Sequence, residues 1–124
     1  MATRRRIVAG NWKMNLDRAG AVALAQGVAT GAHSCGDCNL ILCPSSIYLE
    51  AVASALELAN GVAPSGVALG GQNLHDQPKG AFTGEIAPAM LVDIGCAFCI
   101  VGHSERRTLF GETDSIVNTK AKAV

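Results

Sequence analysis

Polar side chains able to take part in proton transfer gather in one short segment, Ile100–Arg107. Apolar residues there run into a glycine, and His103, Ser104 and Glu105 follow at once. This pattern is typical of a buried parallel strand that emerges at its carboxyl end, where α/β folds place their chemistry. His103 can be neutral or charged near pH 7 and can donate from either ring nitrogen. Because Ser104 and Glu105 favour a helix start, we predict a strand, a sharp turn and a short helix whose amino terminus points back at the imidazole.

A second pair of candidates, Asn11 and Lys13, follows the first apolar run of the chain. At extended spacing these two side chains point the same way. A lysine fixed at a strand end is a point charge suited to an anionic substrate or a developing oxyanion, and an asparagine amide can donate to a bound oxygen. Two plainer interpretations stay open: Lys13 as a solvated surface lysine, and His103 as a structural histidine.

The residues around Ser104 and Glu105 also admit more than one interpretation. Glu105 is either a second catalytic carboxylate or a structural partner of Arg106 or Arg107, and the residues alone favour the structural role. Segment 102–106 matches the G-x-S-x-G elbow of hydrolases except at its last position. The strained elbow needs a small residue there, so Arg106 disfavours Ser104 as a nucleophile.

The candidate side chains must be positioned by strands and helices, which the apolar patterns of the chain predict. The length of 124 residues predicts a single domain over 1–124. Strands are predicted at 6–11, 39–43, 67–71 and 98–101. Helices are predicted at 17–30, from 45 or 46 to about 60, at 85–93 with Pro88 in the first turn, and from 113 or 114 to 124. The first helix should present one apolar face made of Ala21, Val22, Leu24, Ala25 and Val28. Strands that begin about thirty residues apart indicate repeated βαβ units and a parallel sheet.

Composition excludes several classes of protein. Hydrophobic residues make up 49% and charged residues 16%, which argues against disorder. Ten basic and ten acidic residues give a formal net charge of zero, so nothing indicates a nucleic-acid or membrane partner. The apolar run at 7–10 is too short for a signal sequence or a membrane span. We therefore expect a cytoplasmic protein.

Five cysteines include two C-x-x-C pairs, Cys35/Cys38 and Cys96/Cys99, beside Cys43. Such pairs raise the possibility of a zinc site. If the strands lie in sequence order, however, Cys38 and Cys99 belong to strands about 10 Å apart, with another strand between them. That separation is too long for a disulfide and awkward for one tetrahedral site. We expect free thiols and no bound metal.

Two architectures fit the alternation of predicted strands and helices: a doubly wound open sheet and a βα barrel. Segment 10–15 is not the G-x-G-x-x-G expected after the first strand of a dinucleotide fold. Polar residues follow the first, third and fourth strands, and their convergence from non-adjacent strand ends favours a barrel.

Three ordered segments resemble the triosephosphate isomerase family. They are Ala9–Asn15, Gly71–Asn73 followed by Gly80–Glu85, and Val101–Arg107. The cysteine-rich 35–38 segment departs from the family but lies outside these motifs. The resemblance implies the first four βα units of a (β/α)₈ barrel that typically has about 250 residues.

The resemblance also implies roles for individual residues. It makes Asn11 and Lys13 substrate-binding, gives Lys13 an electrostatic role, and makes His103 the electrophile, with Glu105 and Ser104 as possible supporting residues. It further places Thr83, Glu85 and Arg106 at a subunit interface, since the loop around Thr83 inserts beside Asn11 and Lys13 of a neighbouring subunit. The implied reaction interconverts dihydroxyacetone phosphate and glyceraldehyde 3-phosphate without cofactor or metal.

In that family the glutamate base follows the sixth strand, and loops after the sixth to eighth strands hold the phosphate. None of the carboxylates Glu85, Glu105 and Glu112 occupies a matching position. The helical pattern still runs at 120–124 without a cap, so we expect an amino-terminal half, cut or engineered, that is inactive alone. The alternative is a non-catalytic half-barrel that closes by self-association. The expected partners are therefore a phosphorylated triose and either copies of the chain or a complementary carboxyl-terminal half.

Overall fold

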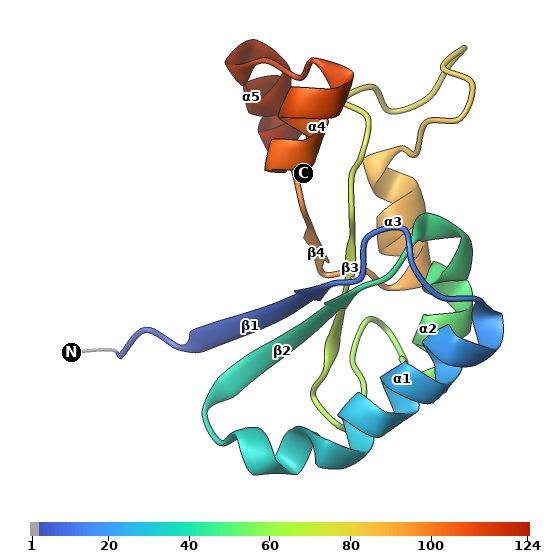
Figure 1. The fold of residues 1–124 in the computed structure, drawn as a ribbon, viewed down its shortest axis with the longest axis vertical. Helices are drawn as coiled ribbons and strands as arrows, with labels where there is room; N and C mark the ends of the chain where they lie inside the picture. The colour runs from blue at the N-terminus through green and yellow to red at the C-terminus, as the bar shows by residue number, and fades with distance from the viewer. Residues whose placement is uncertain (1–2) are drawn as a thin grey trace.

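The computed structural model describes residues 3–124. Its secondary structure alternates between strands and helices along the whole chain (Figure 1). In chain order the elements are β1 (Arg6–Asn11), α1 (Arg18–Gly31), the 3₁₀ turn η1 (Ala32–Cys35), β2 (Cys38–Cys43), the 3₁₀ turn η2 (Ser46–Tyr48), α2 (Leu49–Ala55), β3 (Ala68–Gly71), α3 (Pro88–Ile94), β4 (Phe98–Cys99), α4 (Ser104–Phe110) and α5 (Asp114–Ala123).

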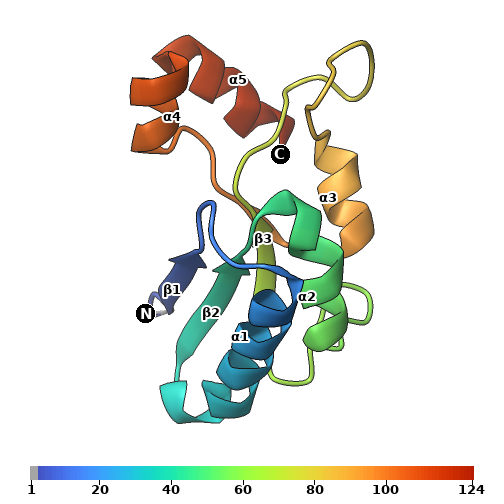
Figure 2. The ribbon, with the colours of Figure 1, turned by 45° about the vertical axis from the view of Figure 1, so that its right-hand side comes forward.

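The four strands form one parallel sheet in the order β1-β2-β3-β4. The longest pairing joins β1 to β2, from Arg6 opposite Cys38 to Asn11 opposite Cys43. This confirms the predicted half-barrel, with β1 and β4 as its two edges. Figure 2 shows α4 and α5 beyond the carboxyl ends of the strands, whereas α1, α2 and α3 flank the sheet.

The main apolar core lies between the sheet and these three flanking helices. Alternate residues of the strands, such as Leu42 and Leu69, point toward the helices and are almost completely buried. Ala21 and Ala25 of α1 are fully buried against them, because small side chains let that helix approach closely. Leu24 is 42% exposed, so the predicted apolar face of this helix was too wide. Asp17 begins the helix by accepting a hydrogen bond from Gly20 N–H at 2.8 Å.

Two helix boundaries differ from the predicted ones for local reasons. The helix predicted from 45 or 46 to about 60 begins with η2 and ends at Ala55, because Glu57 and Asn60 adopt left-handed backbone conformations that cannot continue it. The helix predicted from 85 begins at Pro88. Ala87 is extended, with φ −77° and ψ 151°, as expected of a residue before proline. Glu85 therefore lies in a loop.

The strands mostly match the prediction, but β4 has two residues rather than four. Its partner β3 ends at Gly71, whose carbonyl accepts from Ile100 N–H at 2.8 Å, so the ladder has no further residue to pair with. β2 begins one residue earlier than predicted and β3 one residue later.

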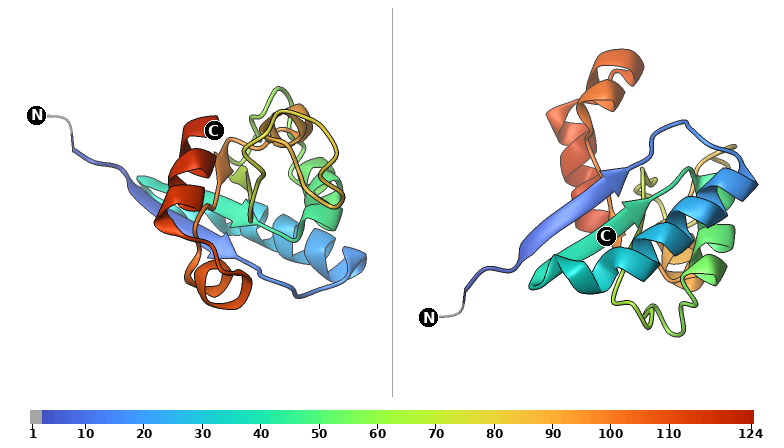
Figure 3. Two further views of the ribbon diagram at one scale, coloured as in Figure 1. Left: turned by 90° about the horizontal axis from the view of Figure 1, so that it is seen from above. Right: turned by 60° about the horizontal axis from the view of Figure 1, so that its bottom comes forward.

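The edge strand β1 is poorly covered on both faces. Ile7 and Val8 point to opposite faces of the sheet and are 56% and 58% exposed. Phe98, on the other edge, is 41% exposed. Figure 3 shows β1 extending away from the helices toward the amino terminus. Within residues 3–124 no helix has the length and apolar character needed to cross a bilayer.

Candidate functional site

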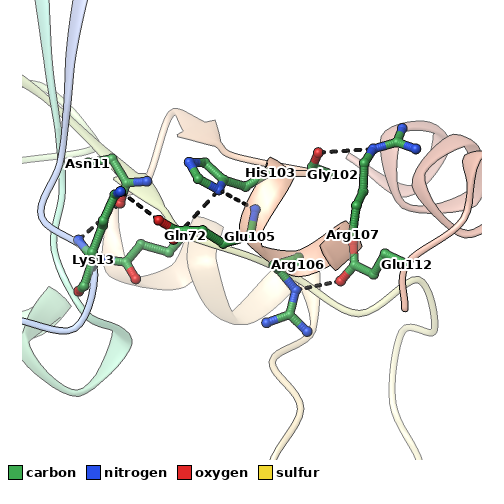
Figure 4. A network of polar contacts seen from close by, with 9 residues as sticks. All are labelled: Asn11, Lys13, Gln72, Gly102, His103, Glu105, Arg106, Arg107 and Glu112. Atoms are coloured by element: carbon green, nitrogen blue, oxygen red, sulfur yellow. Dashed lines mark hydrogen bonds and ion pairs between the residues drawn. The ribbon is translucent and has the colours of Figure 1, made fainter. Parts of the chain in front are cut away.

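The predicted polar residues meet in one open cleft of about 520 Å³ at the carboxyl ends of the strands. Asn11, Lys13, Gln72, His103 and Glu105 all line it. They come from the end of β1, from the residues just after β1 and β3, and from the start of α4, and Figure 4 shows their side chains lying next to one another. Parallel strands bring their carboxyl ends to one edge, which explains how residues more than ninety positions apart are brought together.

Asn11 and Lys13 reach the cleft by a different geometry from the predicted extended one. The strand ends at Asn11, and Lys13 has a left-handed φ of +56°. Asn11 Oδ1 accepts from the Lys13 backbone N–H at 3.0 Å, so the asparagine side chain holds the turn that presents the lysine. The side chain of Lys13 is 51% exposed, and its Nζ is therefore accessible from the cleft.

His103 is the N-cap of α4, as the predicted turn before a short helix implied, although the cap was expected from Ser104 or Glu105. Its Nδ1 accepts from Glu105 N–H at 3.1 Å. A ring nitrogen can accept only when it carries no proton, so this contact selects the neutral tautomer with the proton on Nε2. Glu105 Oε2 lies 3.7 Å from Nδ1, beyond hydrogen-bonding distance, and does not change this assignment. Nε2–H is then the donor that the imidazole offers.

Glu105 pairs with Lys13, not with Arg106 or Arg107 as expected. Lys13 Nζ donates to Glu105 Oε1 at 2.6 Å. This hydrogen bond, together with the positive charge of Lys13, holds the pKa of the Glu105 carboxyl below its ordinary value, against a smaller opposing effect of desolvation. Arg107 instead pairs with Asp114 at 2.6 Å on the surface. The neighbouring Ser104 is exposed in the first turn of α4.

Gln72 has a bracing role that the sequence did not reveal. Its Nε2 donates to the backbone carbonyls of Lys13 and Cys43, both at 2.9 Å. The side chain thus ties the end of β3 to the ends of β1 and β2. The sequence did place a polar residue directly after the third strand, but its partners lie 59 and 29 residues away and have no sequence signature.

A buried charge network beneath the cleft was also missed. Glu112 Oε2 accepts from Lys120 Nζ at 2.8 Å and from Arg106 Nε, and Lys120 also donates to Asn73 Oδ1 at 3.0 Å. The side chains of Glu112 and Lys120 are only 5% and 9% exposed. Burial acts to raise the pKa of Glu112, but the hydrogen bonds from Lys120 and Arg106 outweigh it and the pKa is lowered. The network fixes α5 to the loop after β3.

The loop from 72 to 87 carries the two other predicted interface residues. Thr83 is exposed in this loop, and Glu85 lines the same cleft as Lys13. His75 N–H donates to Ile86 O at 2.8 Å and closes the base of the loop, while the His75 and Phe82 rings stack with centroids 4.3 Å apart. Arg106 lines the same cleft as Glu85 and pairs with Glu112. The interface role of Thr83, Glu85 and Arg106 stays a prediction.

No group of three or more His, Cys, Asp or Glu side chains in the described range 3–124 is placed to bind a metal ion. The cysteines of that range are all free thiols. The cleft thus offers a lysine cation, a neutral imidazole donor and an amide. Such groups stabilise negative charge that develops on a bound oxygen.

Comparisons with known proteins agree with this geometry. Residues 6–124 match the family model described as triosephosphate isomerase. The triosephosphate isomerase of Herpetosiphon aurantiacus is 46% identical over 120 residues, which cover 97% of this chain and 46% of that protein. The triosephosphate isomerase of Magnetococcus marinus is 49% identical over 118 residues, covering 94% of this chain and 44% of that protein. The chain thus spans a little less than half the length of these relatives.

Proposed function

The chain belongs to the triosephosphate isomerase family, and we propose that residues 1–124 form one unit that supplies the charge-stabilising half of such an isomerase site. The proposed reaction interconverts dihydroxyacetone phosphate and D-glyceraldehyde 3-phosphate. The observation that carries the proposal is the convergence of Asn11, Lys13 and His103 on one cleft. No cofactor or metal enters the proposed chemistry.

Each residue has a proposed part in proton abstraction next to a carbonyl. Loss of that proton places negative charge on the carbonyl oxygen, and the resulting enediolate needs nearby donors. His103 acts as the electrophile, because its neutral ring can donate from Nε2 while Nδ1 is held by Glu105 N–H at 3.1 Å. Lys13 and Asn11 bind the substrate, and Lys13 adds a positive charge near the developing oxyanion.

Glu105 and Ser104 have supporting roles in this proposal. The carboxylate of Glu105 lies 2.6 Å from Lys13 Nζ and keeps the lysine at the cleft until an anionic substrate competes for it. Ser104 begins the helix that holds His103 in place. Glu105 is not proposed as the base, because its oxygen is already paired with the lysine.

We further propose that residues 1–124 by themselves have no isomerase activity above background. In the family the glutamate base follows the sixth strand, and the phosphate loops follow the sixth to eighth strands. Of the carboxylates that could substitute, Glu112 is buried and paired, and Glu105 is paired with Lys13. Without a positioned base the proton transfer loses a factor of roughly 10² to 10⁴. Glu85 lines the cleft but lies on a loop. The assay below tests whether Glu85 can take the place of the missing base.

A second candidate function is a self-associating half-barrel without catalytic activity. The exposure of Ile7, Val8 and Phe98 along the two open edges favours it, because unpaired apolar edges recruit partners. In this proposal Thr83, Glu85 and Arg106 contribute to the contact between subunits. Either the edges meet in copies of the chain, or they meet a complementary carboxyl-terminal half.

A coupled assay that follows NADH oxidation tests the proposed function. The purified 124-residue chain is assayed alone and then after adding the carboxyl-terminal half of a family relative. Activity is expected only in the mixture. Lys13→Ala and His103→Ala should each abolish most of it, whereas Lys122→Ala, which removes an exposed lysine of α5, should not.

Turnover by the chain alone that survives repurification and is lost in Glu85→Gln would overturn the proposed inactivity. A mixture that stays inactive while light scattering shows stable assemblies of the chain alone would favour the second candidate function. A strictly monomeric, inactive chain at micromolar concentration that gains activity in the mixture would exclude it.

A further inference from the structure

Cys35 and Cys38 lie at the two ends of a tight turn that the proposed function does not use. The turn joins η1 to β2, and Gly36 has φ +60° and ψ −127°. These angles are those of the first central residue of a type II′ turn, a position that glycine fills without strain. The first and fourth residues of a β-turn have Cα atoms less than about 7 Å apart. A disulfide spans Cα separations of about 4.4 to 6.8 Å, so a β-turn at 35–38 is compatible with a bridge between Cys35 and Cys38.

Solvent access also differs among the five thiols. Cys35 is exposed, Cys38, Cys96 and Cys99 are partly exposed, and Cys43 is buried. Burial raises the pKa of Cys43 to about 11, and burial with the neighbouring Cys43 raises the pKa of Cys96 to about 11. Burial likewise raises the pKa of Cys99 to about 12. Since the thiolate is the reactive form, these three cysteines are poor nucleophiles near neutral pH.

We propose that Cys35 and Cys38 form a dithiol site that is reversibly oxidised to an intramolecular disulfide by low-molecular-weight disulfides such as glutathione disulfide. The exposed Cys35 thiolate attacks one sulfur of the oxidant, forms a mixed disulfide and releases one glutathione thiolate. The Cys38 thiolate then attacks Cys35 Sγ and releases the second glutathione. The two protein thiols lose two protons and two electrons, and one glutathione disulfide becomes two molecules of glutathione.

The dithiol site lies at the end of the sheet opposite to the cleft. Cys38 opens β2, and Cys43, whose carbonyl accepts from Gln72, closes it. Five residue steps along a strand span roughly 17 Å. Oxidation of Cys35 and Cys38 should therefore leave the Lys13–Glu105 pair in place, and the proposal does not depend on the proposed isomerase chemistry.

The test uses the purified, reduced 124-residue chain, equilibrated with glutathione buffers of increasing oxidised fraction. Free thiols are blocked with one alkylating reagent before unfolding and with a heavier one after unfolding and reduction, and peptides are then mapped by mass spectrometry. We expect a monomer that has lost two hydrogens, retains no glutathione, and carries the heavier label only on Cys35 and Cys38. A stable glutathione adduct on Cys35, a bridge that involves another cysteine, or disulfide-linked dimers would overturn the proposal.

Three variants sharpen the test. Cys38→Ser should stop at the glutathione adduct of Cys35, whereas Cys96→Ser, the matched control, should oxidise as the parent chain does. Gly36→Ala has open space for its added carbon, with no atom within 4 Å, so only its positive φ opposes the substitution. Because that strain disfavours the turn, the variant should need a roughly tenfold more oxidising buffer for half-conversion. An unchanged midpoint for Gly36→Ala would contradict the role of the type II′ turn.

Discussion

Replacing Glu112 by glutamine should destabilise the fold strongly, because it removes the one negative charge in a nearly buried network. Lys120 is 9% exposed and donates to Glu112 at 2.8 Å, and Arg106 donates to the same oxygen. Removing one partner of a buried ion pair costs about 3 to 5 kcal/mol. Lys120 keeps its 3.0 Å hydrogen bond to Asn73, and the new amide oxygen can still accept. We therefore expect the lower end, about 3 kcal/mol.

Urea unfolding followed by circular dichroism measures this loss. With a slope of about 1 to 3 kcal/mol per molar urea, the midpoint should fall by roughly 1 to 3 M. Asp114→Asn is the matched control, because its carboxylate also pairs with an arginine, Arg107, at 2.6 Å but is 96% exposed. That exposed pair should contribute less than about 1 kcal/mol.

The loss should also depend on pH, since the pKa of Glu112 is lower in the folded chain than its ordinary value of 4.5. A carboxyl with a depressed folded-state pKa contributes stability above its unfolded-state pKa and loses it as the pH falls through the folded-state value. The stability difference between the parent chain and Glu112→Gln should therefore be full at pH 7 and shrink steadily below about pH 4.5. A difference no larger than that of Asp114→Asn, or one unchanged in acid, would refute the argument.

Two further predictions concern the turn at Gly102 and the Lys13–Glu105 ion pair at the cleft. Gly102 has φ +65°, and an added Cβ would lie 2.6 Å from Val117 Cγ1, so Gly102→Ala should cost more than about 2 kcal/mol in urea unfolding. Gly66→Ala, with φ +79° and no atom within 4 Å, should cost only about 1 kcal/mol, and equal costs would contradict the clash. Lys13→Ala should raise the pKa of the Glu105 carboxyl toward its ordinary value, as measured by an NMR titration, because Lys13 is the main group that lowers it. An unmoved titration midpoint would show that the pair does not form in solution.

Local patterns predicted the elements that local physics controls. The apolar run at 6–11 became β1 with the predicted bounds, and Thr113 caps α5 as expected, with its side chain accepting from Ile116 N–H. The helix after His103 was also predicted from the change of apolar to polar residues. Where helix boundaries were predicted wrongly, single residues decided them. The left-handed backbone of Glu57 ended α2 early, and Pro88 set the start of α3.

The candidate site was found in the sequence because strand ends mark it. Asn11, Lys13 and His103 each stand at or just beyond the carboxyl end of an apolar run, and parallel strands bring those ends together. The family motifs named the same residues. The tautomer of His103 needed the structure, since it follows from the 3.1 Å contact with Glu105 N–H.

Only the tertiary structure decided which charges pair. From the sequence, Glu105 had two adjacent arginines as partners, yet it pairs with Lys13, which lies 92 positions away. Helix geometry is the reason: neighbours in sequence point away from each other on a helix, whereas groups from separate strand ends share one edge. Lys120 likewise donates to both Glu112 and Asn73 inside the fold, and Asn73 lies 47 positions before it. Hydrophobic periodicity is a property of a few consecutive residues and determines where strands and helices form, but a charge pair depends on distance through space, which the packed chain alone sets.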